Sequence, residues 1–285
     1  MTAKVIDGKA LAQKYRHRLK NEVVQLKQKG ITPCLTVLMV GNDPASQSYV
    51  NGKKRACHET GMISEVIALP EQTTEAELLE HVEHLNNKPS VHGILVQLPL
   101  PEHIREYKVI ESIHPNKDVD GFHPINIGRM MVGQETFFPC TPHGIITMLK
   151  AEDISLEGKH VVIVGRSNIV GKPVGQMLLN EHATVTYCHS KTKDLQKFTS
   201  SGDILIVAVG QPHFIRSCDV KPGAVVVDVG INRLNDGTLT GDVDFAEVKQ
   251  KASYITPVPK GVGPMTITML LENTIKAAKG RQTIA

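Results

Sequence analysis

The fold is decided by the stretch HVVIVGRSNIVGKPVG, which spans residues 160–175. Val161 to Val164 form a short apolar run of the kind that a buried parallel strand requires. The run stops at Gly165, and the segment Gly171–Gly175 leads into the apolar residues 177–179 of an expected helix. A strand, a glycine turn and a helix N-terminus suit a nucleotide pyrophosphate, because small residues let backbone N–H groups approach the phosphates and the helix dipole favours negative charge. The stretch therefore predicts a dinucleotide-binding unit.

The spacing of this turn departs from the usual G-x-G-x-x-G, since Ser167 occupies the second glycine position and Gly171 follows. Glycine turns after buried strands also serve only to pack a helix against a sheet. Taken alone, the turn leaves both interpretations open.

The end of the next expected strand, residues 183–188, indicates which dinucleotide is bound. A fold that prefers NAD usually places an acidic residue there, about 20 residues past the glycines, to hold the ribose 2′-hydroxyl. This chain instead has His189-Ser190-Lys191-Thr192, with Arg166 in the glycine turn. Hydroxyls and cations accommodate a 2′-phosphate, so we expect NADP. A polar turn without a ligand remains an alternative for Ser190 and Lys191 individually.

Composition excludes several classes of function. The chain has 285 residues, of which 41% are hydrophobic, so it can bury a substantial core. Aromatic residues make up 4% and tryptophan is absent, which gives little support to base stacking on a nucleic acid. The formal net charge of +3 is too small to imply a polyanion partner. We expect neither nucleic acid nor membrane as a partner.

The cysteines indicate the compartment. Five are present, scattered and without a CxxC pair, which fits reduced thiols better than a disulfide framework or a zinc site. The N-terminus lacks the apolar region of a signal peptide, and no apolar run is long enough to span a bilayer. We therefore expect a cytoplasmic protein with no metal site.

Strands and helices alternate in both halves of the chain, which predicts an α/β fold with parallel sheets. We expect two α/β domains, the second a Rossmann-like doubly wound parallel sheet. The organisation restarts near Pro139, so the expected domains are residues 1–139 and residues 140–265. A last helix from residue 266 is expected to pack back onto the first domain. In sequence order, the expected strands are 35–40, 64–69, 91–98, 161–164, 183–188, 204–209 and 224–229.

Candidate chemistry lies in the first half. Tyr49 and Lys53 are spaced four residues apart on an expected helix over 46–60, so they share one face. A hydroxyl can orient the amine, and partial burial lowers a lysine pKa. The basic run at Lys53 also fits a solvated helix face.

Gln97 ends an expected buried strand, where parallel sheets commonly place ligand contacts. Asp118 and Asp120 also fit Asx turns beside Gly121.

Six blocks resemble the signature blocks of one family, the bifunctional methylenetetrahydrofolate dehydrogenase/methenyltetrahydrofolate cyclohydrolases. They occur in the family's order and cover nearly the whole chain. The blocks are SQSYVNGK (46–53), GILVQLPLP (93–101), NKDVDG (116–121), PCTP (139–142), VGRSNIVG (164–171) and GVGP (261–264).

The resemblance implies NADP-dependent oxidation of 5,10-methylenetetrahydrofolate, then hydrolysis of the methenyl product to 10-formyltetrahydrofolate. It implies a homodimer with a folate-binding cleft between the two domains. The first domain would bind folate and carry catalysis, and the second would bind NADP. A dehydrogenase-only relative and a non-catalytic NADP-sensing protein remain alternatives.

The resemblance also assigns residues. It implies that Lys53 is catalytic and is assisted by Tyr49 and Gln97. The implied substrate-binding residues are Tyr49, Asp120, Gly263 and Pro264. The implied cofactor-binding residues are Gly165, Arg166, Ser167, Ser190, Thr141 and Ile231.

One position departs from the family pattern. The family commonly has Pro-Gly-Gly-Val-Gly-Pro, whereas Lys260 replaces the first glycine here. If that position has a left-handed backbone, lysine costs roughly 1–2 kcal/mol there.

Overall fold

The computed structural model describes residues 2–280, which divide into two compact units. Unit 1 comprises residues 2–12 and 139–266, and unit 2 comprises residues 13–138 and 267–280. The division crosses two helices, α1 (Gly8–Gln28) and α10 (Val262–Gly280). Each unit is therefore assembled from separate stretches of the chain.

Residues 2–12 differ from the expected division, which placed residues 1–139 in one domain. Strand β1 (Lys4–Val5) pairs in parallel with β11 (Tyr254–Ile255), with Lys4 opposite Tyr254. The Lys4 Nζ also forms an ion pair with Glu152 at 2.7 Å. A two-residue strand is too short to leave a periodic pattern, so hydrophobic periodicity could not assign it.

The core of unit 1 is a six-stranded parallel sheet in the order β1-β11-β8-β7-β5-β6. The chain passes from β5 to its neighbour β6 and then crosses to β7 on the other side of β5. The strand order thus reverses between β5 and β7, which confirms the doubly wound sheet predicted from the sequence. The strands are β5 (His160–Val164), β6 (Thr184–Cys188), β7 (Ile204–Val207) and β8 (Val225–Asp228).

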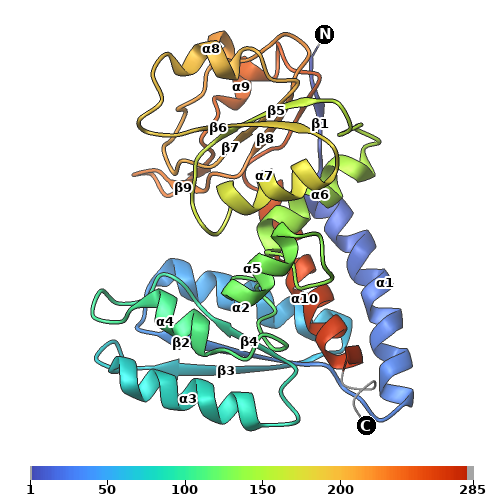
Figure 1. Cartoon of the computed structure of the whole chain (residues 1–285), viewed down its shortest axis with the longest axis vertical. Coiled ribbons are helices and arrows are strands. Elements are labelled where there is room, and N and C mark those ends of the chain that lie inside the picture. Colours follow the sequence, from blue (N-terminus) through green and yellow to red (C-terminus); the bar gives the residue numbers. More distant parts are fainter. Residues whose placement is uncertain (1, 281–285) are drawn as a thin grey trace. The chain divides into compact units, whose positions relative to one another are not determined.

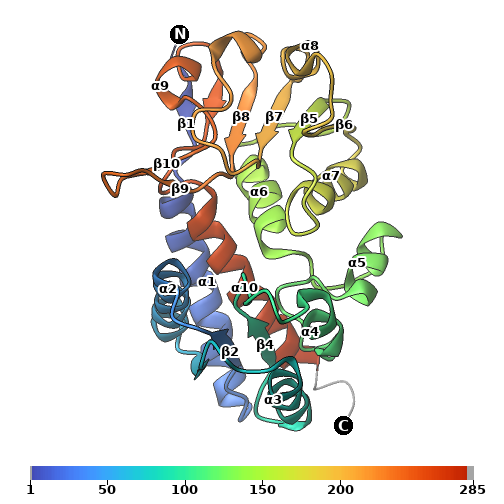
Figure 2. The same ribbon diagram turned by 90° about the vertical axis from the view of Figure 1, so that its left-hand side faces the viewer.

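Helices cover both faces of this sheet (Figures 1 and 2). On one face, Phe198 of α8 (Leu195–Thr199) and Phe245 of α9 (Phe245–Val248) pack against a core that includes Val162 and Leu205. The other face carries α6 (Cys140–Ala151) and α7 (Gly171–Asn180). A short 3₁₀ helix, η1 (Ser217–Asp219), and an antiparallel hairpin of β9 (Asn232–Arg233) and β10 (Leu239–Thr240) complete the unit.

Unit 2 contains a three-stranded parallel sheet in the order β3-β2-β4. The central strand β2 (Cys34–Val40) is buried along its whole length, which explains its almost continuously apolar sequence. The edge strand β3 (Ile63–Leu69) is partly exposed, and β4 (Gly93–Val96) is buried.

Helices also cover both faces of the smaller sheet (Figure 2). On one face, α3 (Glu75–Asn87) and α4 (Glu106–Ser112) contribute Leu78 and Val109 to a core with Leu38. The other face is covered by α2 (Pro44–Thr60) and by the unit 2 parts of α1 and α10. The helix α5 (Pro124–Met131) follows the turn after β4 and α4. Within residues 2–280, no helix combines the length and apolarity needed to cross a bilayer.

Local signals in the sequence fix the ends of the helix that carries Lys53. The Asp43 carboxylate accepts a hydrogen bond from the Ser46 N–H at 2.7 Å, and Pro44 occupies the first turn. At the other end Gly61 adopts a left-handed conformation with φ of 80°. These two caps set the register of α2 and therefore the place of Lys53 on it.

The last helix begins at Val262, four residues before the expected start. Pro264 then lies in the first turn, where a missing N–H costs nothing. Immediately before the helix, Lys260 has a φ of 84°, so the lysine at the position that departs from the family pattern does have a left-handed backbone. The Lys260 carbonyl oxygen accepts a hydrogen bond from the Lys9 N–H at 3.0 Å, so this turn packs against the start of α1.

We predict that Lys260→Gly stabilises the protein. Glycine relieves a left-handed strain of roughly 1–2 kcal/mol, and its greater freedom in the unfolded chain returns about half of that gain. The melting temperature should rise by about 2 °C. Lys249→Gly is the matched control, because Lys249 has an ordinary φ of −56°. Differential scanning calorimetry of both variants measures the effect, and equal destabilisation by both would contradict the assignment.

Candidate functional site

In unit 2 the structure brings Lys53 and Gln97 together. The Lys53 Nζ, on α2, donates a hydrogen bond to the Gln97 Oε1 at 2.9 Å. Gln97 directly follows β4, and its backbone N–H donates to the Leu38 carbonyl oxygen at 2.8 Å. The Gln97 Nε2 donates to the Leu98 carbonyl oxygen at 2.6 Å, which orients the amide so that its oxygen meets the lysine. Lys53 is half-buried.

An amide beside the amine has a chemical consequence. A carboxylate at the position of Gln97 would favour the charged form of Lys53, because an opposite charge stabilises an ammonium group. A neutral amide oxygen can accept an N–H from either the amine or the ammonium form. The amide therefore fixes the position of the Lys53 Nζ without favouring either its protonated or its neutral form. This suits a group that exchanges protons.

Tyr49 lies one helical turn before Lys53 on α2, as the four-residue spacing predicts. Its side chain is 41% exposed. The next residues along the helix, Lys54 and Arg55, are exposed, unlike Lys53. The basic run thus divides into one half-buried lysine and two solvated cations.

The turn after α4 assigns different roles to its two aspartates. Asp118 is only 2% exposed, and its carboxylate accepts hydrogen bonds from the N–H groups of Gly121, Phe122 and His123. The Asn126 side chain donates to the same carboxylate at 2.7 Å. Burial raises the pKa of Asp118, and these donors oppose the shift. Asp118 therefore builds the turn, while Asp120 is half-buried within it.

Lys117 anchors the same turn and was missed by sequence reasoning. It is 5% exposed, and its Nζ donates to the carbonyl oxygens of Leu85 at 2.6 Å and Lys88 at 2.9 Å. These carbonyls lie at the C-terminal end of α3, where the helix dipole favours a cation. The available signal was a lysine beside an aspartate, Lys117 next to Asp118, in a segment too short to show periodicity.

In unit 1 the atoms around Gly165 and Gly175 explain why both positions are glycine. Gly165 has a φ of 129°, and a Cβ there would collide with the Ala208 carbonyl oxygen. Further along α7, a Cβ at Gly175 would collide with the Tyr187 ring of β6. The first glycine thus lets neighbouring strand ends approach, and the second lets the helix pack closely on the sheet.

Ser167 changes the expected phosphate site. Its Oγ accepts the N–H groups of Val170 at 3.2 Å and Gly171 at 3.3 Å, and its carbonyl oxygen accepts the N–H of Lys172 at 3.1 Å. These three N–H groups are bonded to Ser167, so the binding of a pyrophosphate at the start of α7 stays a prediction that involves the dipole and the remaining groups of the turn. The serine that replaces a glycine caps the helix, and the exposed turn before it remains available for a ligand.

The turn after β6 lies at the same edge of the sheet as the glycine turn. Val164 pairs with Cys188, and the Gly165 N–H donates to the Cys188 carbonyl oxygen at 2.9 Å. The Thr192 Oγ1 accepts the His189 N–H at 2.8 Å and closes the turn, and its O–H can still act as a donor. The side chains of Arg166, Ser190 and Lys191 are exposed.

Arg166, Ser190 and Lys191 have the chemistry that NADP binding needs. A cation beside a glycine turn, followed by a hydroxyl and a second cation at the next strand end, matches the chemistry of a ribose 2′-phosphate. The positive end of the α7 dipole and the close approach at Gly165 suit the pyrophosphate. Among residues 2–280 no carboxylate forms an ion pair with Arg166.

The remaining expected site residues lie at the start of α6, after β8 and at the start of α10, all in unit 1. The Thr141 and Thr266 hydroxyls are 3.0 Å apart. Ile231 is 45% exposed, and its Cδ1 would lie 3.8 Å from a Cβ placed on Gly263. Pro264 follows in the first turn of α10. Gly263 and Pro264 thus belong to unit 1, whereas the other expected substrate residues belong to unit 2.

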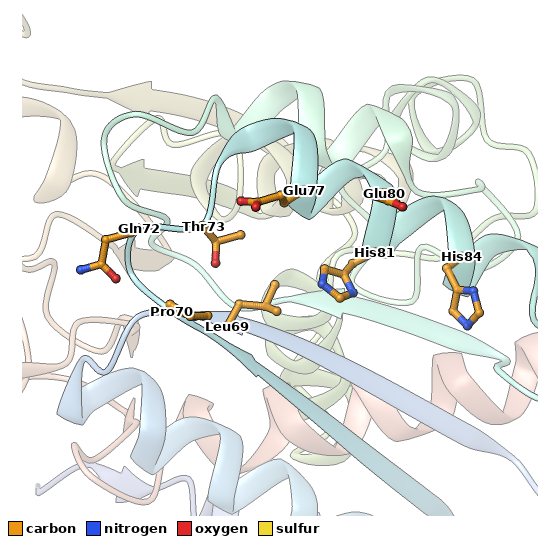
Figure 3. Close-up of a pocket in the computed structure, with 8 residues that line it drawn as sticks. All are labelled: Leu69, Pro70, Gln72, Thr73, Glu77, Glu80, His81 and His84. Carbon is orange, nitrogen blue, oxygen red and sulfur yellow. The ribbon is translucent and has the colours of Figure 1, made fainter.

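A separate hollow of about 680 Å³ lies beside α3 (Figure 3). His81 and His84 project into it from one side of the helix. It contains none of the expected site residues. Its lining residues are Leu69, Pro70, Gln72, Thr73, Glu77, Glu80, His81 and His84.

Two family models match the chain in the order of its two halves. Residues 6–120 match the catalytic domain of tetrahydrofolate dehydrogenase/cyclohydrolase. Residues 139–282 match the NAD(P)-binding domain of the same family. The chain belongs to the tetrahydrofolate dehydrogenase/cyclohydrolase family.

Relatives support membership over the full length. A bifunctional protein FolD of Oceanobacillus iheyensis is 63% identical over 98% of each chain. The structure of the bifunctional FolD dehydrogenase/cyclohydrolase from Campylobacter jejuni has 57% identity and a TM-score of 0.97, covering 98% of this chain and 99% of that one. The Trypanosoma brucei FolD, whose structure contains an NADP cofactor and an inhibitor, has 38% identity and a TM-score of 0.96 over the whole of both chains.

We predict that the two aspartates of the NKDVDG block of this family member respond differently to substitution. Asp118→Ala removes four hydrogen bonds in a buried site and should lower the free energy of unfolding by about 3 kcal/mol or more. Asp120→Ala should change stability far less but should weaken folate binding and both activities. Urea unfolding and folate titration of the two variants measure this. The roles are wrongly assigned if Asp120→Ala destabilises as much as Asp118→Ala.

Proposed function

We propose that this family member is a bifunctional folate enzyme. It oxidises 5,10-methylenetetrahydrofolate to the methenyl form with NADP, and it hydrolyses the methenyl form to 10-formyltetrahydrofolate. The observation that carries the proposal is the hydrogen bond between Lys53 and Gln97 in a chain that matches both domains of the family.

We further propose that the enzyme is a cytoplasmic homodimer. Five free thiols fit a reducing compartment, and the family resemblance supports the dimer.

The two reactions place different demands on the protein. In the methylene substrate the one-carbon unit bridges two nitrogens, whose lone pairs stabilise the cation that oxidation leaves. Oxidation therefore needs chiefly alignment. NADP, when bound, supplies the two-electron acceptor. The chain contributes Arg166, Ser190, the glycine turn at Gly165 and the Thr141 and Ile231 side chains as the proposed holding residues.

Hydrolysis of the methenyl cation needs a proton carrier. Water must lose a proton as it adds to the one-carbon unit, and a ring nitrogen must gain one as the ring opens. We assign the role of proton carrier to Lys53. Gln97 holds its amine by a hydrogen bond, and Tyr49 lies on the same helix face. A cationic substrate beside the amine disfavours the ammonium form and so favours the base. Asp120 supplies two acceptor oxygens for adjacent N–H donors of the pterin ring.

A direct assay tests the whole proposal. Formation of methenyltetrahydrofolate is followed by absorbance with NADP and with NAD in parallel, and hydrolysis of the methenyl compound is followed without any nicotinamide. A bifunctional enzyme is active in both assays. Hydrolysis that is absent while oxidation persists identifies a dehydrogenase-only relative, and folate binding without turnover identifies a non-catalytic protein.

Lys53→Met should separate the two reactions. Methionine keeps the length of the side chain but lacks the amine, so the hydrolysis should fall by about 10²–10⁴-fold, the usual contribution of a general acid–base group. Oxidation should fall less. Lys54→Met is the matched control, because Lys54 is exposed and lies off the Tyr49 face. Both rates are measured for both variants together with folate affinity. Unimpaired hydrolysis in Lys53→Met would remove the lysine from catalysis.

Arg166→Ala should distinguish the two nicotinamide cofactors. Only NADP carries the 2′-phosphate, so its dissociation constant should rise roughly 10- to 100-fold while that of NAD changes little. Arg216→Ala, at a second exposed arginine of unit 1, serves as the control. Isothermal titration with both cofactors measures the difference. An equal loss of affinity for NADP and NAD would show that Arg166 does not bind the phosphate.

A further inference from the structure

Two buried carboxylates lie near the carboxyl ends of the central strands of unit 1, and the proposed chemistry does not use either of them. Asp228 is the last residue of β8 and is 3% exposed. Asp242 follows the β9–β10 hairpin and is fully buried. Burial raises the pKa of Asp228 to about 7, and the neighbouring Asp242 charge adds to the shift. Such a pair is costly to bury and persists only if many donors surround it.

Asp242 is surrounded by four N–H donors. Three belong to consecutive residues after β7: Val209 donates to the Asp242 Oδ2 at 2.6 Å, Gly210 to the Oδ2 at 2.9 Å, and Gln211 to the Oδ1 at 2.9 Å. The fourth is the Asn232 side chain, which donates to the Oδ1 at 2.9 Å. Consecutive backbone N–H groups that converge in this way form an anion-binding concavity. Here the anion is the chain's own carboxylate.

Asp228 holds Asp242 in place. Its Oδ1 accepts the N–H groups of Gly230 and Asp242, both at 3.0 Å, and its Oδ2 accepts the N–H of Val243 at 2.9 Å. A Cβ at Gly241 would collide with the Asp228 carboxylate. The segment that carries Asp242 is therefore fastened to the end of β8.

The loops held by this pair lie where a doubly wound sheet receives its dinucleotide. Residues 209–211 follow β7 after Ala208, and the neighbouring strand β5 leads into the glycine turn. The Ala208 N–H donates to the Val164 carbonyl oxygen at 2.8 Å. The strand order reverses between these two strands, and ligands bind at such a reversal. Ile231, a proposed cofactor residue, lies between Gly230 and Asn232, which are bonded to Asp228 and Asp242 respectively.

We propose that Asp242 is a positioning residue for NADP binding. Its carboxylate accepts hydrogen bonds from the loop after β7 and from the loop after β8. These bonds hold Val209–Gln211 and Ile231 in the conformation that the cofactor requires. Since β6 and the glycine turn serve the 2′-phosphate and the pyrophosphate, the part of the cofactor affected is the remaining half, over β7 and β8. The inference rests on the proposed function, because it assumes that unit 1 binds NADP.

The bifunctional chemistry provides an internal control for the test. In Asp242→Asn an amide nitrogen replaces one oxygen and cannot accept an N–H, so at least one loop loses its anchor. The NADP dissociation constant should rise about tenfold or more, and the KM for NADP should rise with it. Hydrolysis of methenyltetrahydrofolate, assayed without NADP, should stay within about twofold of wild type. Amide hydrogen exchange at residues 209–211 should accelerate in the cofactor-free protein.

Asp244→Asn is the matched control, since the Asp244 carboxylate lies two residues away but only caps α9, accepting the Glu247 N–H at 3.1 Å. It should leave NADP affinity unchanged. Asn232→Ala removes a single donor to Asp242 and keeps the proposal testable if Asp242→Asn does not fold. It should raise the NADP dissociation constant by a smaller factor.

The proposal is overturned if folded Asp242→Asn, or Asn232→Ala in its place, binds NADP like wild type. It is also overturned if both activities and the melting temperature fall together, because Asp242 then only supports the fold. Failure of the proposed function is distinct from these outcomes, since it would appear in the wild-type enzyme as an absence of NADP binding.

Discussion

The requirement to satisfy buried charge organises the candidate site of this protein. Lys117, Asp118 and Asp242 are each at most 5% exposed, and each is held largely by backbone groups. A buried charge without partners is too costly to keep, so the loops around these residues fold to supply donors or acceptors. Two of the residues proposed to contact ligands, Asp120 and Ile231, lie in those same loops. Their positions therefore depend on charges that never meet a ligand.

The two units supply different kinds of chemistry. Unit 2 provides a half-buried amine held by an amide, with a rigid aspartate turn elsewhere in the unit, and these suit proton exchange and pterin recognition. Unit 1 provides a parallel sheet whose strand ends approach closely because Gly165 has no side chain, which suits a dinucleotide. The two activities thus depend on different features, the amine–amide pair of unit 2 and the parallel sheet of unit 1. Substitution in one unit can therefore affect one reaction more than the other.

The sequence predicted four of the six strands of the unit 1 sheet, because strands such as β5 are short apolar runs, and it missed the two-residue strands β1 and β11. The departure at Lys260, just before the GVGP block, indicated where a left-handed backbone would be costly, and the structure has one there. The contact between Lys53 and Gln97 joins positions 44 residues apart, which no local pattern reveals. Only the resemblance put these two residues in one site. The capping role of Ser167 and the anchoring role of Asp242 escaped sequence reasoning, since each depends on where backbone N–H groups converge in space.

The pairing of Lys4 with Tyr254 has a consequence for the order in which the chain can be completed during synthesis. The strand made first on the ribosome must wait for a partner made almost last. Closing so long a loop costs entropy that local contacts do not repay, so the six-stranded sheet acquires its β1 edge late. Residues 13–138, made before that partner, contain a complete three-stranded sheet of their own. Translation therefore delivers the lysine-bearing unit's sheet before the cofactor unit's sheet can close.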